Sequence, residues 1–163
     1  MVFELYQVGL AFVAALIGLF AWAGFTWRKR AKAQDHQLAT PEFTEFKNVG
    51  SSGLYVATTF ADRPLDRVSA HGLGFAGKAN VHVSDSEVQV FRSGEQSFKI
   101  NSSALLDLSR TAGVIDKVVE KDGLLSLRWK LGEAELESHF RFANSQARDD
   151  IALKVSKLIV GTH

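Results

Sequence analysis

The sequence contains no cysteine and only two prolines among 163 residues. The absence of cysteine excludes disulfides, cysteine-based zinc sites, iron–sulfur clusters and thiol nucleophiles. An excess of charge of one sign is also missing, since 19 basic residues nearly balance 18 acidic ones. After residue 32 the count is 15 basic to 17 acidic residues. The sequence therefore does not predict a basic nucleic-acid-binding domain, and nucleic acid is not an expected partner.

Motifs for catalysis and cofactor binding are missing as well. Residues 72–77 match GxGxxG. A dinucleotide-binding turn, however, needs a strand before it and a helix after it, and here a strand pattern follows. None of the five histidines has metal-ligand spacing, and His82 and His139 alternate with apolar neighbours, which predicts exposed strand positions. We expect no enzyme activity, no cofactor and no metal.

A long apolar run lies at the N-terminus. Residues 5–27, LYQVGLAFVAALIGLFAWAGFTW, carry no charge over 23 positions. As a helix this run would be about 34 Å long, enough to cross a hydrocarbon core of about 30 Å. The alternative, a cleaved signal peptide, needs a basic start, but the chain begins with Glu4 and no lysine or arginine. We predict a transmembrane helix within residues 1–27.

Basic residues follow this run and none precedes it. Because positive charge stays on the cytoplasmic side, we expect the N-terminus outside and the remaining chain in the cytoplasm, anchored in the plasma membrane by one span. These charges either set the topology alone or also bind anionic lipid. They are Arg28, Lys29, Arg30 and Lys32.

The lipid bilayer is thus the first expected partner. Within the apolar run, Ala14 and Gly18 form a small-xxx-small pair that allows close helix approach, so a weak homodimer stays open. Residues 28–50 form a basic juxtamembrane segment and linker in which Pro41 ends any helix, because the residue before proline avoids the helical region.

Residues 51–163 predict a mainly β domain with one helix. Stretches with a period of two, rich in β-branched and aromatic residues, predict about seven antiparallel strands. The eight candidate stretches are Leu54–Phe60, Gly77–Ser84, Glu87–Arg92, Ser97–Ile100, Leu105–Arg110, Val114–Glu120, Leu124–Leu131 and Ala134–Phe142.

Three hairpins follow from the turns between these stretches. Asp85-Ser86 places Val83 opposite Val88, and Gly132-Glu133 places Trp129 opposite Leu136. The dipeptide Asp122-Gly123 predicts that Val114–Glu120 pairs with Leu124–Leu131.

The pattern becomes helical after Asn144, a good helix cap. The apolar residues Ala147, Ile151, Val155 and Leu158 lie on one face of a helix over residues 145–159. This face is expected to dock on the sheet.

The order of about seven strands and a closing helix is that of pleckstrin-homology (PH) domains. LLSLRWKLGEAELESHFRF followed by NSQARDDIALKVSKLI resembles their last two strands and C-terminal helix. With WRKR, GLYVATTFADRPLDRVSAHGLGFAGKA and DGLLSLRW, the whole chain resembles small actinobacterial single-span membrane proteins with a bacterial PH-like domain, often labelled transporter or export proteins. The resemblance implies a bent antiparallel sheet capped by the helix, and no catalytic motif.

In PH domains that bind lipid headgroups, cations surround the first inter-strand loop. The resemblance places that loop near residues 61–76, where Arg63 and Arg67, with Lys78 just after, form the candidate ligand loop, although Asp62 and Asp66 oppose them.

Three functions stay open at this point. The first is a membrane-tethered, non-catalytic interaction or scaffold module on the cytoplasmic face, with an unidentified cytoplasmic or membrane protein as its partner. The second is an accessory subunit of a membrane transport or cell-envelope assembly. The third is an anionic-lipid sensor.

Overall fold

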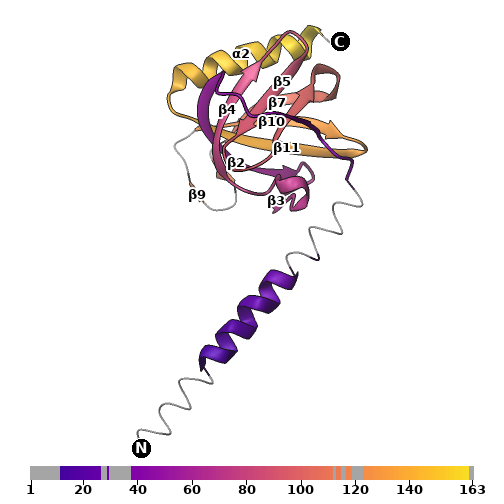
Figure 1. Ribbon diagram of the computed structural model, residues 1–163. Coiled ribbons are helices and arrows are strands. Elements are labelled where there is room, and N and C mark those ends of the chain that lie inside the picture. The colour runs from indigo at the N-terminus through magenta and orange to yellow at the C-terminus, as the bar shows by residue number, and fades with distance from the viewer. Residues whose placement is uncertain are drawn as a thin grey trace, which may run out of the picture.

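The computed structural model describes residues 12–26, 29, 38–111, 113–114, 117–118 and 123–161. They form an N-terminal helix, a bent antiparallel sheet and a C-terminal helix, α2 (Ser145–Gly161) (Figure 1). The predicted class, mainly β with α and a helix after the sheet, is confirmed.

The N-terminal helix covers residues 12–26 and leaves its apolar side chains exposed. Residues 5–11 and Trp27, which complete the predicted span, lie outside the described residues. In the described part of the chain, no helix is both long enough and apolar enough to cross a membrane.

The main sheet has nine strands. Their order is β1-β6-β5-β4-β2-β11-β10-β7, and β3 also pairs with β2. The strands are β1 (Glu42–Thr44), β2 (Ser51–Phe60), β3 (Arg63–Arg67), β4 (Gly77–Val83), β5 (Glu87–Arg92), β6 (Ser97–Asn101), β7 (Leu105–Thr111), β10 (Leu124–Leu131) and β11 (Ala134–Phe142). A separate two-stranded ribbon pairs β8 (Gly113–Val114) with β9 (Lys117–Val118).

Two short strands of the main sheet were not predicted. β1 lies in the stretch 28–50 expected to be a linker, and it pairs with β6 through Phe43 and Phe98. β3 lies in the expected first loop and pairs with β2. Neither shows a clear alternation of apolar residues, because each is a short strand with mostly exposed or half-buried side chains.

The two predicted tight hairpins have the expected registers. Val83 lies opposite Val88 in β4–β5, and Trp129 lies opposite Leu136 in β10–β11. Gly132, in the second turn, has a φ of +60°, a backbone conformation that glycine adopts without strain. The turn positions and the alternation of apolar residues therefore predicted these two pairings correctly.

The pairing predicted across Asp122-Gly123 is wrong. β10 pairs with β7 instead, with Leu124 opposite Thr111 and Leu127 opposite Leu108. The Asp-Gly dipeptide favours only a local turn. Pairing with β7 gives β10 a longer run of backbone partners and buries Leu105 in the core. Asp122 itself lies outside the described residues.

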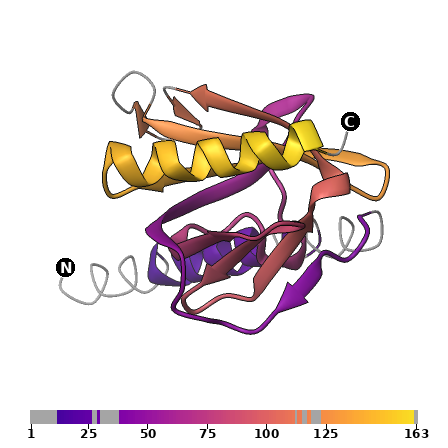
Figure 2. The same cartoon turned by 90° about the horizontal axis from the view of Figure 1, so that it is seen from above.

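The C-terminal helix docks as predicted. Asn144 Oδ1 accepts a hydrogen bond from the Ala147 backbone nitrogen at 2.8 Å, which caps the first turn. Ile151 and Val155 are buried, while Asp149 and Lys154 on the other side are exposed. The strand β2 lies between two parts of the bent sheet, one formed by β1, β6, β5 and β4 and the other by β11, β10 and β7. The helix packs against β4 in the first part, against β7 and β11 in the second, and against β2 (Figure 2).

The core is centred on aromatic side chains from several strands. Trp129 is 2% exposed, stacks on Phe98 with ring centroids 6.0 Å apart, and donates from Nε1 to Ser138 Oγ at 3.0 Å. Tyr55 meets both Phe98 and Phe140 edge-on. The ring of Trp129 on β10 therefore reaches Phe98 on β6, while its indole N–H bonds Ser138 on the neighbouring strand β11.

Replacing Trp129 with alanine should lower the free energy of unfolding by about 3–5 kcal/mol, because it removes a buried ring and leaves a cavity. Denaturant unfolding of the full chain measures this change. Leu153→Ala on the exposed side of α2 is the control, expected within about 0.5 kcal/mol of wild type. A loss below about 1 kcal/mol for Trp129→Ala would contradict its assigned place in the core.

Removing α2 tests whether the helix belongs to the same folding unit. A chain that ends at Phe142 exposes the side chains that Ile151 and Val155 cover. It should unfold without a cooperative transition, since a small sheet does not bury enough apolar surface without its closing layer. A sharp two-state transition in this truncated chain would show that α2 is dispensable for the core.

Candidate functional site

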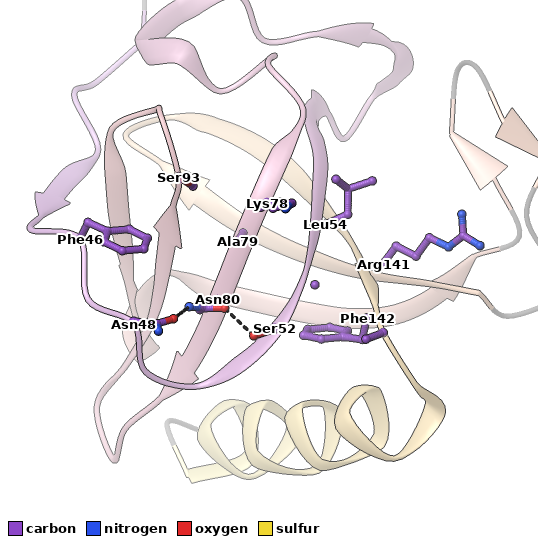
Figure 3. A pocket seen from close by; sticks show the side chains of 12 residues that line it. Phe46, Asn48, Ser52, Leu54, Lys78, Ala79, Asn80, Ser93, Arg141 and Phe142 are labelled. Atoms are coloured by element: carbon purple, nitrogen blue, oxygen red, sulfur yellow. Dashed lines mark hydrogen bonds between the residues drawn. The ribbon is translucent and has the colours of Figure 1, made fainter.

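A groove opens on the outer face of the sheet, between the segment after β1 and the end of β11. Its volume is about 580 Å³. Side chains from β2, β4 and β11 form its floor and one side, and Phe46 and Asn48 form the other side (Figure 3). The lining residues are Phe46, Asn48, Ser52, Gly53, Leu54, Lys78, Ala79, Asn80, Ser93, Arg141, Phe142 and Ala143.

Two cations flank a leucine across three adjacent strands of this groove. Lys78 on β4 lies opposite Leu54 on β2, and Leu54 lies opposite Arg141 on β11. Since neighbouring strands are about 4.8 Å apart, the backbones of Lys78 and Arg141 are roughly 10 Å apart. Leu54 is 40% exposed, and both cations are exposed.

Among the residues that the structure describes, no carboxylate lines the groove. Within the described part of the chain, the side chains of Lys78 and Arg141 form no hydrogen bond or ion pair. Lys99 illustrates the contrast, because its Nζ lies 3.1 Å from carboxylate oxygens of both Glu42 and Glu87. The groove is therefore a place of uncompensated positive charge on a body that is otherwise close to neutral.

A chain of side-chain hydrogen bonds orders the floor. Ser52 Oγ donates to Asn80 Oδ1 at 2.8 Å, and Asn80 Nδ2 donates to Asn48 Oδ1 at 2.8 Å (Figure 3). These bonds attach the segment before β2 to the sheet. Only glycine fits the turn at position 50, where φ is +95°. A side chain there would place its Cβ 2.3 Å from the Val81 carbonyl oxygen.

The chemistry of the groove is that of binding. Its polar groups are amides, hydroxyls and two cations, and no histidine or carboxylate stands beside Ser52 or Ser93 to activate a hydroxyl. Across the described residues, no three histidine, aspartate or glutamate side chains come close enough to hold a metal ion. Such a set can bind an anionic group and pack on an apolar one.

The structure brings only one of the three candidate loop cations into this groove. Arg67 lies opposite Thr59 on β2, five positions from Leu54, so Lys78 and Arg67 are roughly 17 Å apart along the strand. Arg63 forms ion pairs within its own loop, with Asp66 at 3.0 Å and with Asp62 at 3.5 Å. Arg63, Arg67 and Lys78 therefore do not form one cluster.

The juxtamembrane cations are described only in part. Lys29 is exposed, with its Nζ 5.9 Å from the centre of the Phe25 ring. Arg28, Arg30 and Lys32 lie outside the described residues.

Arg141 was not predicted as a site residue, although its hairpin register carried a usable signal. In β10–β11, Lys130 lies opposite Glu135 and Arg128 lies opposite Glu137. Continuing this register places Leu124 opposite Arg141, so Arg141 alone lacks an acidic neighbour across the hairpin. Its proximity to Lys78 needs the β11–β2–β4 order, which no local pattern indicates.

A buried arginine stabilises the opposite side of β4 and β5. Arg92 is 2% exposed, donates from Nη1 to the Gly72 carbonyl at 2.9 Å, and donates from Nε to the Gln96 carbonyl at 3.0 Å. Its guanidinium lies 4.9 Å from the centre of the Tyr55 ring. Burial lowers the pKa of Arg92 and raises the pKa of Tyr55 to about 12.

The GxGxxG segment, residues 72–77, has a structural role beside Arg92 and Tyr55. The Leu73 carbonyl accepts hydrogen bonds from the Tyr55 hydroxyl at 2.6 Å and from the Thr58 backbone nitrogen at 2.8 Å. The short helix η1 (Ala70–Gly72) and its following turn are thereby held on the core.

His139 was predicted to lie on the surface, and this prediction is wrong. The side chain is 2% exposed, with Nδ1 2.8 Å from Ser126 Oγ and Nε2 3.1 Å from Thr59 Oγ1. Alternation placed it on the outer face correctly, but it could not show that this part of the outer face is covered. His82 is half-buried. Burial lowers the pKa of His139 to about 4.

Comparison of the sequence with known protein families agrees with this architecture. The profile of the family described as "Bacterial PH domain-like" matches residues 34–156, three quarters of the chain. The chain belongs to this family. A search of curated proteins finds no match.

The buried His139 should make stability depend on pH. An unfolded histidine titrates near 6.5, whereas folded His139 titrates near 4, so below about pH 6.5 the unfolded chain binds more protons. The free energy of unfolding should therefore fall between pH 6.5 and 4, by up to about 3 kcal/mol.

His139→Gln, which keeps hydrogen-bonding groups, should remove this loss. The measurement is the difference in unfolding free energy between wild type and variant across this pH range. His82→Gln is the control and should keep the wild-type dependence. A difference between wild type and His139→Gln that does not change with pH would mean that His139 titrates normally in the folded chain.

Proposed function

We propose that this bacterial PH domain-like protein is a membrane-tethered, non-catalytic interaction module that acts on the cytoplasmic face of the plasma membrane. PH-like domains are interaction modules for proteins or lipids. The observation that carries the tether is the N-terminal helix, whose large apolar side chains are exposed in the described part of the chain. They include Phe12, Ile17, Phe20, Trp22 and Phe25, each more than 60% exposed.

The apolar helix supports a membrane location on physical grounds. An exposed surface of this kind in water would associate with another apolar surface, and a bilayer provides one. The surrounding run of 23 uncharged residues has the length that a single span needs. A tethered domain would meet a partner at the membrane at a raised effective concentration.

The orientation follows from Arg28, Lys29, Arg30 and Lys32. Because basic residues are retained on the cytoplasmic side, residues 28–163 are proposed to be cytoplasmic, with the N-terminus outside.

The groove supports the interaction role. It offers the cations Lys78 and Arg141 beside exposed Leu54. Among the described residues these cations have no acidic partner, and no lining group would activate a nucleophile. Arg63 is neutralised by its own loop, which disfavours the alternative of a headgroup sensor built on that loop.

A second candidate is an accessory subunit of a membrane transport or cell-envelope assembly. It is favoured by the open side of the helix at Gly18, where an added Cβ would meet nothing within 4 Å. Together with Ala14, this small-residue surface would allow another helix to approach closely, including a second copy of this chain.

The full chain should sediment with membranes and resist extraction by alkaline carbonate. A C-terminal reporter that is active only in the cytoplasm should be active. Replacing Arg28, Lys29, Arg30 and Lys32 with glutamine should reduce that activity, because the topology signal is lost. Recovery of the full chain in the soluble fraction would refute the tether, and activity of an exterior-only reporter would reverse the orientation.

Exchanging residues 1–27 for an unrelated single-span anchor separates the two candidates. If the helix only tethers, crosslinking at the membrane should yield the same partner proteins from the exchanged chain as from wild type. If those partners are lost while the protein stays in the membrane, the helix itself has a partner, and the accessory-subunit function is favoured.

A further inference from the structure

We infer that the groove around Leu54 binds an acidic segment of a partner protein, in which two carboxylates flank an apolar side chain. This inference rests on the proposed role as an interaction module and gives its partner a chemistry. It also assigns Arg141, Lys78 and Leu54 as the contact residues.

The charge of the groove is the first argument. The cations Lys78 and Arg141 lie two strands apart on one face, and neither has an acidic partner among the described residues. Some other cations of the body do have an acidic partner, as Arg110 has in Asp149 at 3.1 Å. Bringing a carboxylate to each groove cation would form ion pairs without breaking any ion pair between described residues.

The spacing gives the second argument. The cation-bearing positions are separated by roughly 10 Å, and in an extended chain the side chains at alternate positions i, i+2 and i+4 share one face and span about 13 Å. Leu54 lies between them and is 40% exposed, and Phe46 on the groove side is 54% exposed. A leucine or phenylalanine between two acidic residues would cover this apolar surface while the carboxylates meet the cations.

The floor offers hydrogen-bonding groups for a peptide backbone. Asn48 already accepts from Asn80 through its Oδ1, which leaves the Asn48 Nδ2 group as a donor at the edge of the groove. An exposed amide donor beside an apolar surface suits a peptide carbonyl. This combination favours a peptide over a free anion, which would not use Leu54 or Phe46.

The charge of the whole body favours a protein segment over a bilayer. After residue 32 the chain has 15 basic and 17 acidic residues, so an anionic membrane would gain little from the domain beyond these two cations. An acidic peptide contacts the groove alone and avoids the neighbouring carboxylates.

Selection from a random peptide library tests the inference. Full-length protein, held in non-ionic detergent, is used as bait, and the Lys78→Gln/Arg141→Gln double variant is the counter-bait. Selected peptides should be enriched in aspartate and glutamate around leucine or phenylalanine. Their affinity for the double variant should fall at least about tenfold, and wild-type binding should weaken as salt is raised.

The Lys154→Gln/Lys157→Gln variant is the matched control, because it removes the same charge from the exposed side of α2. It should bind the selected peptides like wild type. Both replaced groove cations are exposed and have no ion-pair partner among the described residues, so the double variant should keep wild-type thermal stability. Selected peptides without acidic enrichment, or with equal affinity for the double variant, would overturn the inference.

Vesicles distinguish the other source of negative charge. Flotation with phosphatidylserine vesicles should not differ between wild type and the double variant. If vesicle binding depends on Lys78 and Arg141 while the library yields no acidic peptide, the groove is a lipid site and the inference is wrong. If wild type and the double variant crosslink to the same partners at the membrane, the groove inference fails while the interaction module stands.

Discussion

The central position of β2 is the constraint on which both the core and the groove depend. This ten-residue strand pairs with β3, β4 and β11, so it joins the two parts of the bent sheet. Because successive side chains point to opposite faces, Tyr55 enters the core while its neighbour Leu54 lies in the groove. A shift of one residue in this strand would exchange the two.

The core is unusual for the polar groups that it holds. Arg92 and Tyr55 are buried together, and Thr58 Oγ1 and Ser138 Oγ lie 2.6 Å apart beside the Trp129 indole. Buried polar groups destabilise a fold unless they are hydrogen-bonded, and these bonds reach the turn after η1 through Leu73. The network thus holds the first inter-strand segment against the sheet, independently of any ligand.

The groove and the tether make complementary contributions to the proposed role. Two exposed ion pairs and one leucine contact would give only a weak interaction in solution. Confinement to a membrane would raise the effective concentration of a partner that lies there, so weak contacts at Lys78 and Arg141 would suffice. In the proposed role the groove would therefore contribute selectivity for acidic segments, and the helix would contribute proximity.

Local sequence signals were sufficient wherever a neighbour in sequence is also the neighbour in space. The turn at Gly132-Glu133 determined the pairing of Trp129 with Leu136, and Asn144 with the apolar stripe determined α2. Alternation also determined which face each of these side chains takes, because strand and helix periods are properties of the local backbone. The mainly β class with a closing helix followed from these elements alone.

Only the tertiary structure decided the long-range features. The pairing of β10 with β7, the burial of His139 and the meeting of Lys78 with Arg141 all depend on strands that are far apart in sequence. An Asp-Gly dipeptide or an alternating histidine has the same local signal whatever lies across the sheet. Strand order and the burial of each face of the sheet depend on the packing of the whole core. The groove could therefore not be predicted without knowing that β2 lies between β4 and β11.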